Sequence, residues 1–187
     1  MITAAELAHW RTASVDLEAT ERLRGEFALM REQGGALSLG LSDLERILEW
    51  KLRSQYRRTA SYRTLLTDSI VRQVTAVAFA VQHADEQFET ELKVRLLCTL
   101  PGVGVGVASA ILALTHPERY AVIDYRNWRQ VFDEERTTFS LGQYVQYLSR
   151  IRDIAAQLRW LPQEVDLAIW EYDRRMGGST ESGRSRR

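Results

Sequence analysis

The stretch that most constrains this chain is an apolar segment interrupted by a proline and closely spaced glycines. It reads Leu-Pro-Gly-Val-Gly-Val-Gly-Val over residues 100–107 and continues as an alanine-rich run to Leu114. Apolar residues recur at helical spacing on both sides of it. Because glycine alone enters positive φ without strain, Pro-Gly-x-Gly predicts a tight turn, which Gly104→Ala should strain. The sequence therefore predicts a helix, a hairpin and a second helix over about 86–115.

A hairpin of this kind can bind an anion through its backbone. Successive N–H groups can converge on one ligand, and the second helix adds the positive end of its dipole. Small residues let the backbone, rather than a side chain, reach the ligand. The natural ligand is a nucleic-acid phosphate, bound without regard to base sequence. The predicted contacts are Gly102, Gly104, Val105, Gly106 and Val107.

A short apolar run after the second helix ends at Asp124. An aspartate here has an ordinary explanation, because Asp often accepts hydrogen bonds from the first amides of the helix that it precedes. It also has a chemical explanation, because a carboxylate can stabilise positive charge on a sugar and activate a water molecule. From the residues alone, both roles stay open.

The hairpin, the alanine-rich helix and the spaced aspartate together resemble the helix-hairpin-helix DNA glycosylases of the endonuclease III superfamily, over about residues 97–131. The resemblance implies a catalytic Asp124 and a base that leaves the stack for a pocket. Bifunctional members carry a lysine nucleophile at the position of Gly106, which lies 18 residues before Asp124. The resemblance therefore implies a monofunctional glycosylase that uses water, leaves an abasic site and has no lyase activity.

Such a pocket needs aromatic walls, and the candidates are Trp50, Tyr125 and Trp128. Trp128 is also similar to a residue of members that remove oxidised guanine. Two amines, on Lys51 and Lys93, could in principle replace the missing nucleophile. Lys93 falls on the first hairpin helix, where we expect it to be solvated.

A basic stretch without acidic residues lies between positions 50 and 67, interleaved with aromatic residues. Such a stretch can hold a phosphate backbone and stack on bases, or it can form a solvated helix face. We expect one helix to carry Lys51, Arg53, Arg57 and Arg58. The predicted DNA contacts outside the hairpin are Lys51, Arg53, Arg57, Arg126 and Arg129.

Helical periodicity elsewhere predicts an all-α fold, resembling the DNA glycosylase fold without an iron–sulfur cluster. Capping boxes at Thr3 and Ser42 and a proline at position 162 mark helix starts, and Trp170 reads as a core anchor. We predict a single compact domain over 1–176 and a disordered basic tail over 177–187.

The composition limits partners and cofactors. The 25 basic and 25 acidic residues cancel, so nucleic-acid binding must come from local patches. The single cysteine, Cys98, excludes a disulfide framework and a four-cysteine iron–sulfur cluster. The three histidines lack ligand spacing. We expect no cofactor, with a monovalent cation at the hairpin as the one alternative.

The sequence shows no signal peptide and no apolar span of transmembrane length, so we expect a cytoplasmic protein. We expect a monomer that binds double-stranded DNA and no membrane. The resemblance implies a role in DNA repair, or in antiviral defence against phage DNA with modified bases.

Three other functions stay open. Gly102-Val-Gly104 before a helix, with an acid about 20 residues on, also suggests a dinucleotide site, but the third glycine is missing and no strand–helix alternation follows. A non-enzymatic helix-hairpin-helix DNA-binding module would need the hairpin but no pocket at Asp124. A protein-interaction domain is the third alternative, consistent with the near-zero net charge.

Overall fold

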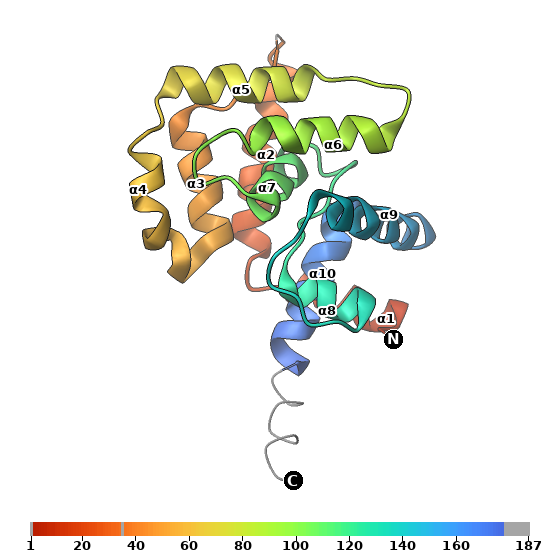
Figure 1. Cartoon of the computed structure of the whole chain (residues 1–187). Coiled ribbons are helices and arrows are strands. Elements are labelled where there is room, and N and C mark those ends of the chain that lie inside the picture. The colour runs from red at the N-terminus through yellow and green to blue at the C-terminus, as the bar shows by residue number, and fades with distance from the viewer. Residues whose placement is uncertain (1, 35, 178–187) are drawn as a thin grey trace.

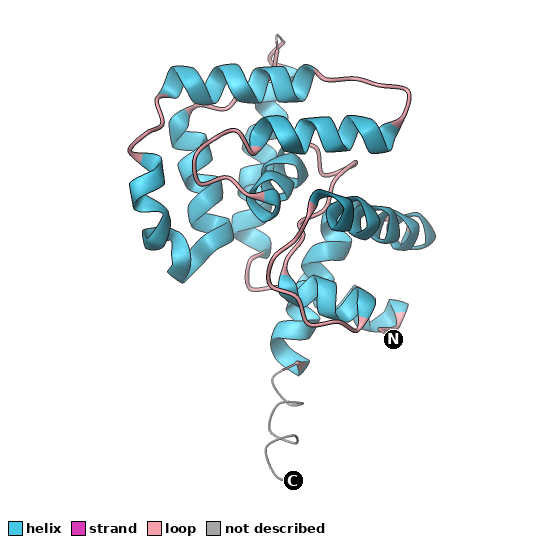
Figure 2. Cartoon of the chain, viewed as in Figure 1, coloured by secondary structure: helices cyan, strands magenta, loops and turns pink. Residues whose placement is uncertain are grey.

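The computed structural model describes residues 2–34 and 36–177. No strand occurs within these ranges, so the predicted all-α fold is confirmed and a dinucleotide-binding parallel sheet is excluded for this part of the chain (Figure 2). The elements are α1 (Ala4–Ala13), α2 (Leu17–Glu32), α3 (Leu41–Leu52), the 3-10 helix η1 (Arg53–Thr59), α4 (Ala60–Arg63), α5 (Asp68–Ala80), α6 (Glu86–Leu97), α7 (Val105–Thr115), α8 (Tyr125–Phe132), α9 (Leu141–Leu158) and α10 (Pro162–Met176).

The helices form two groups (Figure 1). Helices α2 to α7 make one group, and α1, α8, α9 and α10 make the other. Helix α1 packs against α10, so the two ends of the described chain meet in the second group. The chain crosses between the groups before α2 and again between α7 and α8.

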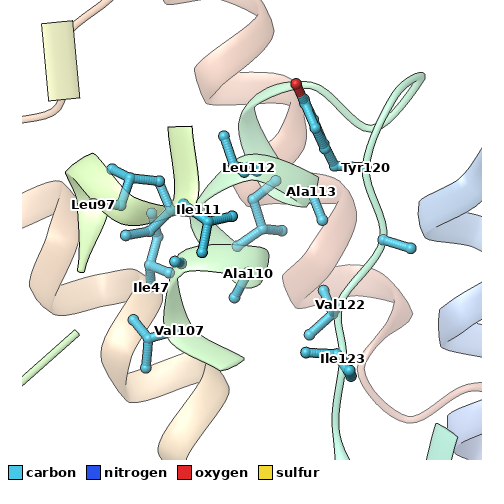
Figure 3. Packing of buried hydrophobic residues seen from close by; sticks show 14 of the residues in the cluster. Ile47, Leu97, Val107, Ala110, Ile111, Leu112, Ala113, Tyr120, Val122 and Ile123 are labelled. Carbon is cyan, nitrogen blue, oxygen red and sulfur yellow. The ribbon is translucent and has the colours of Figure 1, made fainter. Parts of the chain in front are cut away.

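Helix α7 is the centre of the hydrophobic core. Its residues from Val107 to Thr115 are all buried, and it contacts α2, α3, α6, α9 and α10. In Figure 3, Ile47 and Leu97 lie on one side of α7, and Tyr120, Val122 and Ile123 of the following segment lie on the other. The small side chains of this helix allow that close approach from both sides.

Most predicted helix starts are confirmed. Thr3 and Glu6 form the expected capping box, and Pro162 occupies the first turn of α10. The predicted start at Ser42 is wrong. Helix α3 begins after Gly40, because the carboxylate of Asp43 accepts from the Gly40 amide at 2.9 Å and Asp68 of α5 accepts from the Leu41 amide at 2.8 Å.

The basic stretch does not lie on one helix. Helix α3 ends at Leu52, and Arg53 has a φ of 51° and a ψ of −119°. This break leaves Lys51 on α3 and places Arg57 and Arg58 on η1. These cationic residues are therefore divided between two helices.

Two expectations concern the edges of the described chain. The tail predicted over 177–187 lies outside the described residues, apart from Gly177, which directly follows α10. Over residues 2–34 and 36–177, none of the helices combines the length and the apolar composition that crossing a membrane requires.

The predicted hairpin is confirmed, with α6 and α7 on either side of residues 98–104. The position in the hairpin that requires glycine is Gly102, which has a φ of +83°. A Cβ added to Gly102 would lie 3.2 Å from Cβ of Tyr62. Gly104 has a φ of −97° and open space around it, so the expectation that alanine would strain the turn at Gly104 is wrong.

We predict that Gly102→Ala destabilises the protein and that Gly104→Ala is the matched control. The first substitution forces an L-residue into left-handed backbone and presses on Tyr62, which should lower the free energy of unfolding by about 1–2 kcal/mol. The second should change it by less than about 0.5 kcal/mol. Urea unfolding followed by circular dichroism measures both. Equal stability of the two variants would contradict this account of the turn.

Candidate functional site

The site is built around residues 120–123, an extended segment that is buried without a strand partner. Buried peptide groups need hydrogen-bond partners, and here side chains supply them. Ser109 of α7 accepts from the Ile123 amide at 3.1 Å, and Asp166 of α10 accepts from the Val122 amide at 2.6 Å. The donors to the segment's carbonyl groups are Lys51, Asn127, Tyr144 and Tyr147.

Asp124 follows this segment and caps α8. Its Oδ1 accepts from the amides of Arg126 at 2.9 Å and Asn127 at 3.0 Å, so the ordinary explanation for an aspartate at this position holds. Its Oδ2 lies 3.7 Å from Nζ of Lys51. The side chain is 19% exposed. One carboxylate oxygen therefore fixes the helix start, while the other faces a cation.

A cavity of about 40 Å³ lies beside Asp124, between the two groups of helices. A water molecule needs roughly 10–15 Å³ of such space, so the cavity has room for a few waters only. The first group of helices and the crossing before it contribute Asp16, Trp50, Lys51 and Arg53. The other lining residues are Val122, Asp124, Asn127, Asp166, Leu167 and Trp170.

Lys51 enters this cavity from the end of α3. Its Nζ donates to the Ile123 carbonyl at 3.1 Å and pairs with Asp124, and its side chain is 12% exposed. The Lys51 side chain is thus engaged with a carbonyl group and a carboxylate. The contacts suit a cation that holds the carboxylate in place.

Two further polar groups line the cavity wall. Burial raises the pKa of the Asp166 carboxyl well above its ordinary value, although the Val122 amide and Lys51 favour its charged form. Asn127 donates to the Val122 carbonyl at 3.1 Å, while its Oδ1 is buried with no hydrogen-bond partner among the described residues. The wall therefore offers an uncommitted acceptor beside Asp124.

Arg53 lies at the rim of the cavity. Its guanidinium bonds to the carboxylate of Asp16 and stacks on Trp170, 4.3 Å from the ring centroid. The side chain is 46% exposed, so it reaches from the cavity to solvent. A non-glycine residue with a φ of 51° and a ψ of −119° carries backbone strain of about 1–3 kcal/mol.

The structure brings together only part of the predicted aromatic pocket. Trp50 lines the cavity. Tyr125 is 39% exposed and lies under the guanidinium of Arg126, outside the cavity lining. Trp128 is buried against Phe132 and Phe139, so the structure places it in the core and not in this cavity wall, because the apolar face of α8 turns inward.

Two of the predicted DNA contacts hold a buried carboxylate instead. Arg129 binds both oxygens of Asp173, at 3.0 and 2.8 Å, and Arg126 binds Asp173 at 3.0 Å. Although burial opposes the charge, these bonds keep the pKa of Asp173 below its ordinary value. Arg126 and Arg129 therefore serve the packing of α8 on α10. Arg57 is exposed on η1.

The hairpin presents an uncapped helix start. Gly104 is the N-cap residue of α7 and offers no side chain to the first amides, those of Val105 and Gly106. The Val107 amide donates to the Gly104 carbonyl at 3.0 Å, and the Val107 side chain lies in the core. Ser109 donates to the Gly106 carbonyl at 2.8 Å and also bonds Ile123, which ties this helix start to the segment before Asp124.

The expectation of a solvated Lys93 is wrong. Lys93 is 3% exposed, pairs with Glu89 at 3.3 Å and donates to the Phe79 carbonyl at 3.3 Å. The acidic partner one turn away on α6 compensates the buried charge. Because Lys93 is absent from the lining of the Asp124 cavity, it cannot supply an amine there.

Sequence reasoning missed Asp166, Trp170 and Asn127. Asp166 interrupts an apolar run on α10, and an acid in such a run is a usable signal. Trp170 lies four residues on, on the same helix face, and was expected in the core. Asn127 gave no signal of its own.

Comparison of the chain with protein-family models, with curated proteins and with solved structures found no match. The resemblance to helix-hairpin-helix glycosylases therefore rests on the hairpin and the spacing to Asp124. Among the residues that the structure describes, no three or more His, Cys, Asp or Glu side chains are grouped to hold a metal ion.

We predict that Asp166→Asn stabilises the protein, increasingly so at higher pH. The unfolded carboxyl ionises above about pH 3.9, whereas burial keeps the folded one protonated to higher pH. Folding of the wild type therefore takes up a proton, and its stability falls as pH rises from about 4 to the folded pKa, by at most about 1.4 kcal/mol per pH unit. Denaturant unfolding at pH 4, 6 and 8 measures the difference. A gap that shrinks with rising pH would contradict a neutral Asp166.

Proposed function

We propose that this protein is a monofunctional DNA glycosylase, which hydrolyses the bond between a modified or damaged base and its sugar. The observation that carries the proposal is the position of Asp124. One of its oxygens caps α8, the other faces Lys51, and the residue lines a water-sized cavity. Ser109 ties the same segment to the uncapped start of α7. The amides that are proposed to bind phosphate and the Asp124 carboxylate are thus held by the same hydrogen-bonded segment.

In this proposal each group has a separate task. The first amides of α7 hold a backbone phosphate, with Arg53 and Arg57 as further cationic contacts. The Asp124 carboxylate stabilises the positive charge that develops on the sugar and orients a water molecule. Lys51 holds that carboxylate, and Trp50 and Trp170 flank the cavity that the extruded base approaches.

The base that the protein releases is to be identified by experiment. Mass spectrometry of bases released from DNA carrying uracil, alkylated, oxidised or mismatched bases, and from phage DNA with modified bases, identifies it. Release from phage DNA alone would favour defence over repair as the cellular role.

We predict that Asp124→Asn strongly slows base release and keeps DNA binding. Asparagine retains an oxygen for the Arg126 and Asn127 amides, so α8 keeps its cap. The charge that stabilises the sugar cation is lost, which should slow single-turnover release by roughly 10²–10⁴-fold. Circular dichroism and DNA affinity serve as controls. A variant that releases base at the wild-type rate would reduce Asp124 to a cap. A folded wild type that binds DNA but releases no base would favour a non-enzymatic DNA-binding module.

We predict that the product is an intact abasic strand. Cleavage by elimination needs an amine that forms an imine with the sugar, and Gly106 offers none. Treated DNA should run at full length on a denaturing gel until alkali cuts it, and borohydride should trap no protein–DNA adduct. Lys51 is the amine nearest to Asp124, so Lys51→Ala is the informative variant. An adduct formed by the wild type and lost in Lys51→Ala would make Lys51 the nucleophile.

A further inference from the structure

The cavity beside Asp124 is closed to a nucleotide in this structure. Its volume of about 40 Å³ is far below the roughly 300 Å³ or more of pockets that enclose organic ligands. If the protein removes bases as proposed above, some lining group must move. Among the charged lining side chains, Arg53 is the most exposed, at 46%, against 18% for Asp16.

Two side-chain contacts hold Arg53 in its present place. Its guanidinium bonds to the Asp16 carboxylate and stacks on Trp170, while its backbone occupies a strained φ and ψ. The side-chain contacts favour this arrangement, and the backbone strain opposes it. An anion that competes with Asp16 for the guanidinium would therefore be favoured by the backbone, because the strain at Arg53 is relieved when Arg53 leaves its present conformation.

Asp16 offers Arg53 the same chemistry as a DNA phosphate. A carboxylate and a phosphate each present paired anionic oxygens to the donor fork of a guanidinium. Asp16 lies where the chain crosses from α1 to α2, so its pair with Arg53 and the stack on Trp170 of α10 join the two groups of helices. Asp16 and Arg53 line the same cavity as Asp124, so the pair stands at the rim of that cavity.

We propose that Arg53 closes the cavity by pairing with Asp16 in the free protein and exchanges this carboxylate for a backbone phosphate when DNA binds. The exchange places Arg53 on the phosphate next to the extruded nucleotide and uncovers Trp170 and the cavity. Asp16 thus occupies the phosphate position in the absence of DNA. This inference rests on the proposed function.

The test is a double-mutant cycle on DNA affinity. The probe is a duplex with one tetrahydrofuran abasic-site analogue, which contains no bond to hydrolyse, and the readout is fluorescence anisotropy between 50 and 200 mM salt. The variants are Asp16→Asn, Arg53→Ala and the double variant, with Arg150→Ala as a matched exposed arginine and Glu18→Gln as a matched exposed acid.

We expect Arg53→Ala to weaken binding about tenfold and to lower the salt slope by about 0.9, as loss of one phosphate contact requires. Asp16→Asn should tighten binding several-fold when Arg53 is present and leave it unchanged within twofold in the Arg53→Ala background. Glu18→Gln should have the same small effect in both backgrounds.

Two results would overturn the exchange while leaving the glycosylase proposal intact. One is tightening by Asp16→Asn of equal size in both backgrounds, which would reflect removal of a repulsive charge only. The other is an Arg53→Ala loss no larger than that of Arg150→Ala. Absence of binding by the folded wild type would overturn both proposals.

Discussion

The candidate site depends on how the buried peptide groups of residues 121–123 find hydrogen-bond partners. Each such group left unpaired would cost about 1–3 kcal/mol, and no strand is there to pair with them. The partners come instead from side chains on α3, α7, α8, α9 and α10. Because these helices belong to both groups, each hydrogen bond also fixes the groups relative to one another. The same hydrogen bonds therefore also fix the position of Asp124, the next residue.

Part of the arginine content pairs with buried carboxylates on α10. Asp173 forms ion pairs with Arg126 and Arg129, and Glu171 forms ion pairs with Arg174 and Arg175. Both carboxylates are fully buried, so the arginines around α10 neutralise them. The equal numbers of acidic and basic residues in the chain are consistent with this use. The proposed DNA contacts are therefore the hairpin backbone and the arginines on or next to η1.

The fold class, the hairpin and most caps could be predicted from the sequence, because each depends on neighbours within a few residues. The turn needed a glycine at Gly102, and the Asp124 carboxylate caps amides only two and three residues away. The break at Arg53 could not be foreseen, because contacts with Asp16 and Trp170, far away in sequence, hold it. For the same reason the sequence placed Trp128 in a pocket wall and left Asp166 out of the site.

The packing of α1 against α10 has a consequence for folding kinetics. The first group of helices, α2 to α7, is contiguous in sequence and rich in contacts between successive elements. The second group combines the first and last helices of the described chain, so its contact order is high and its assembly is slower. During synthesis, the part of the cavity lining that lies on α3 is present before α10 has emerged. Asp166 and Trp170 lie on α10, so the cavity beside Asp124 forms only after α10 has been synthesised.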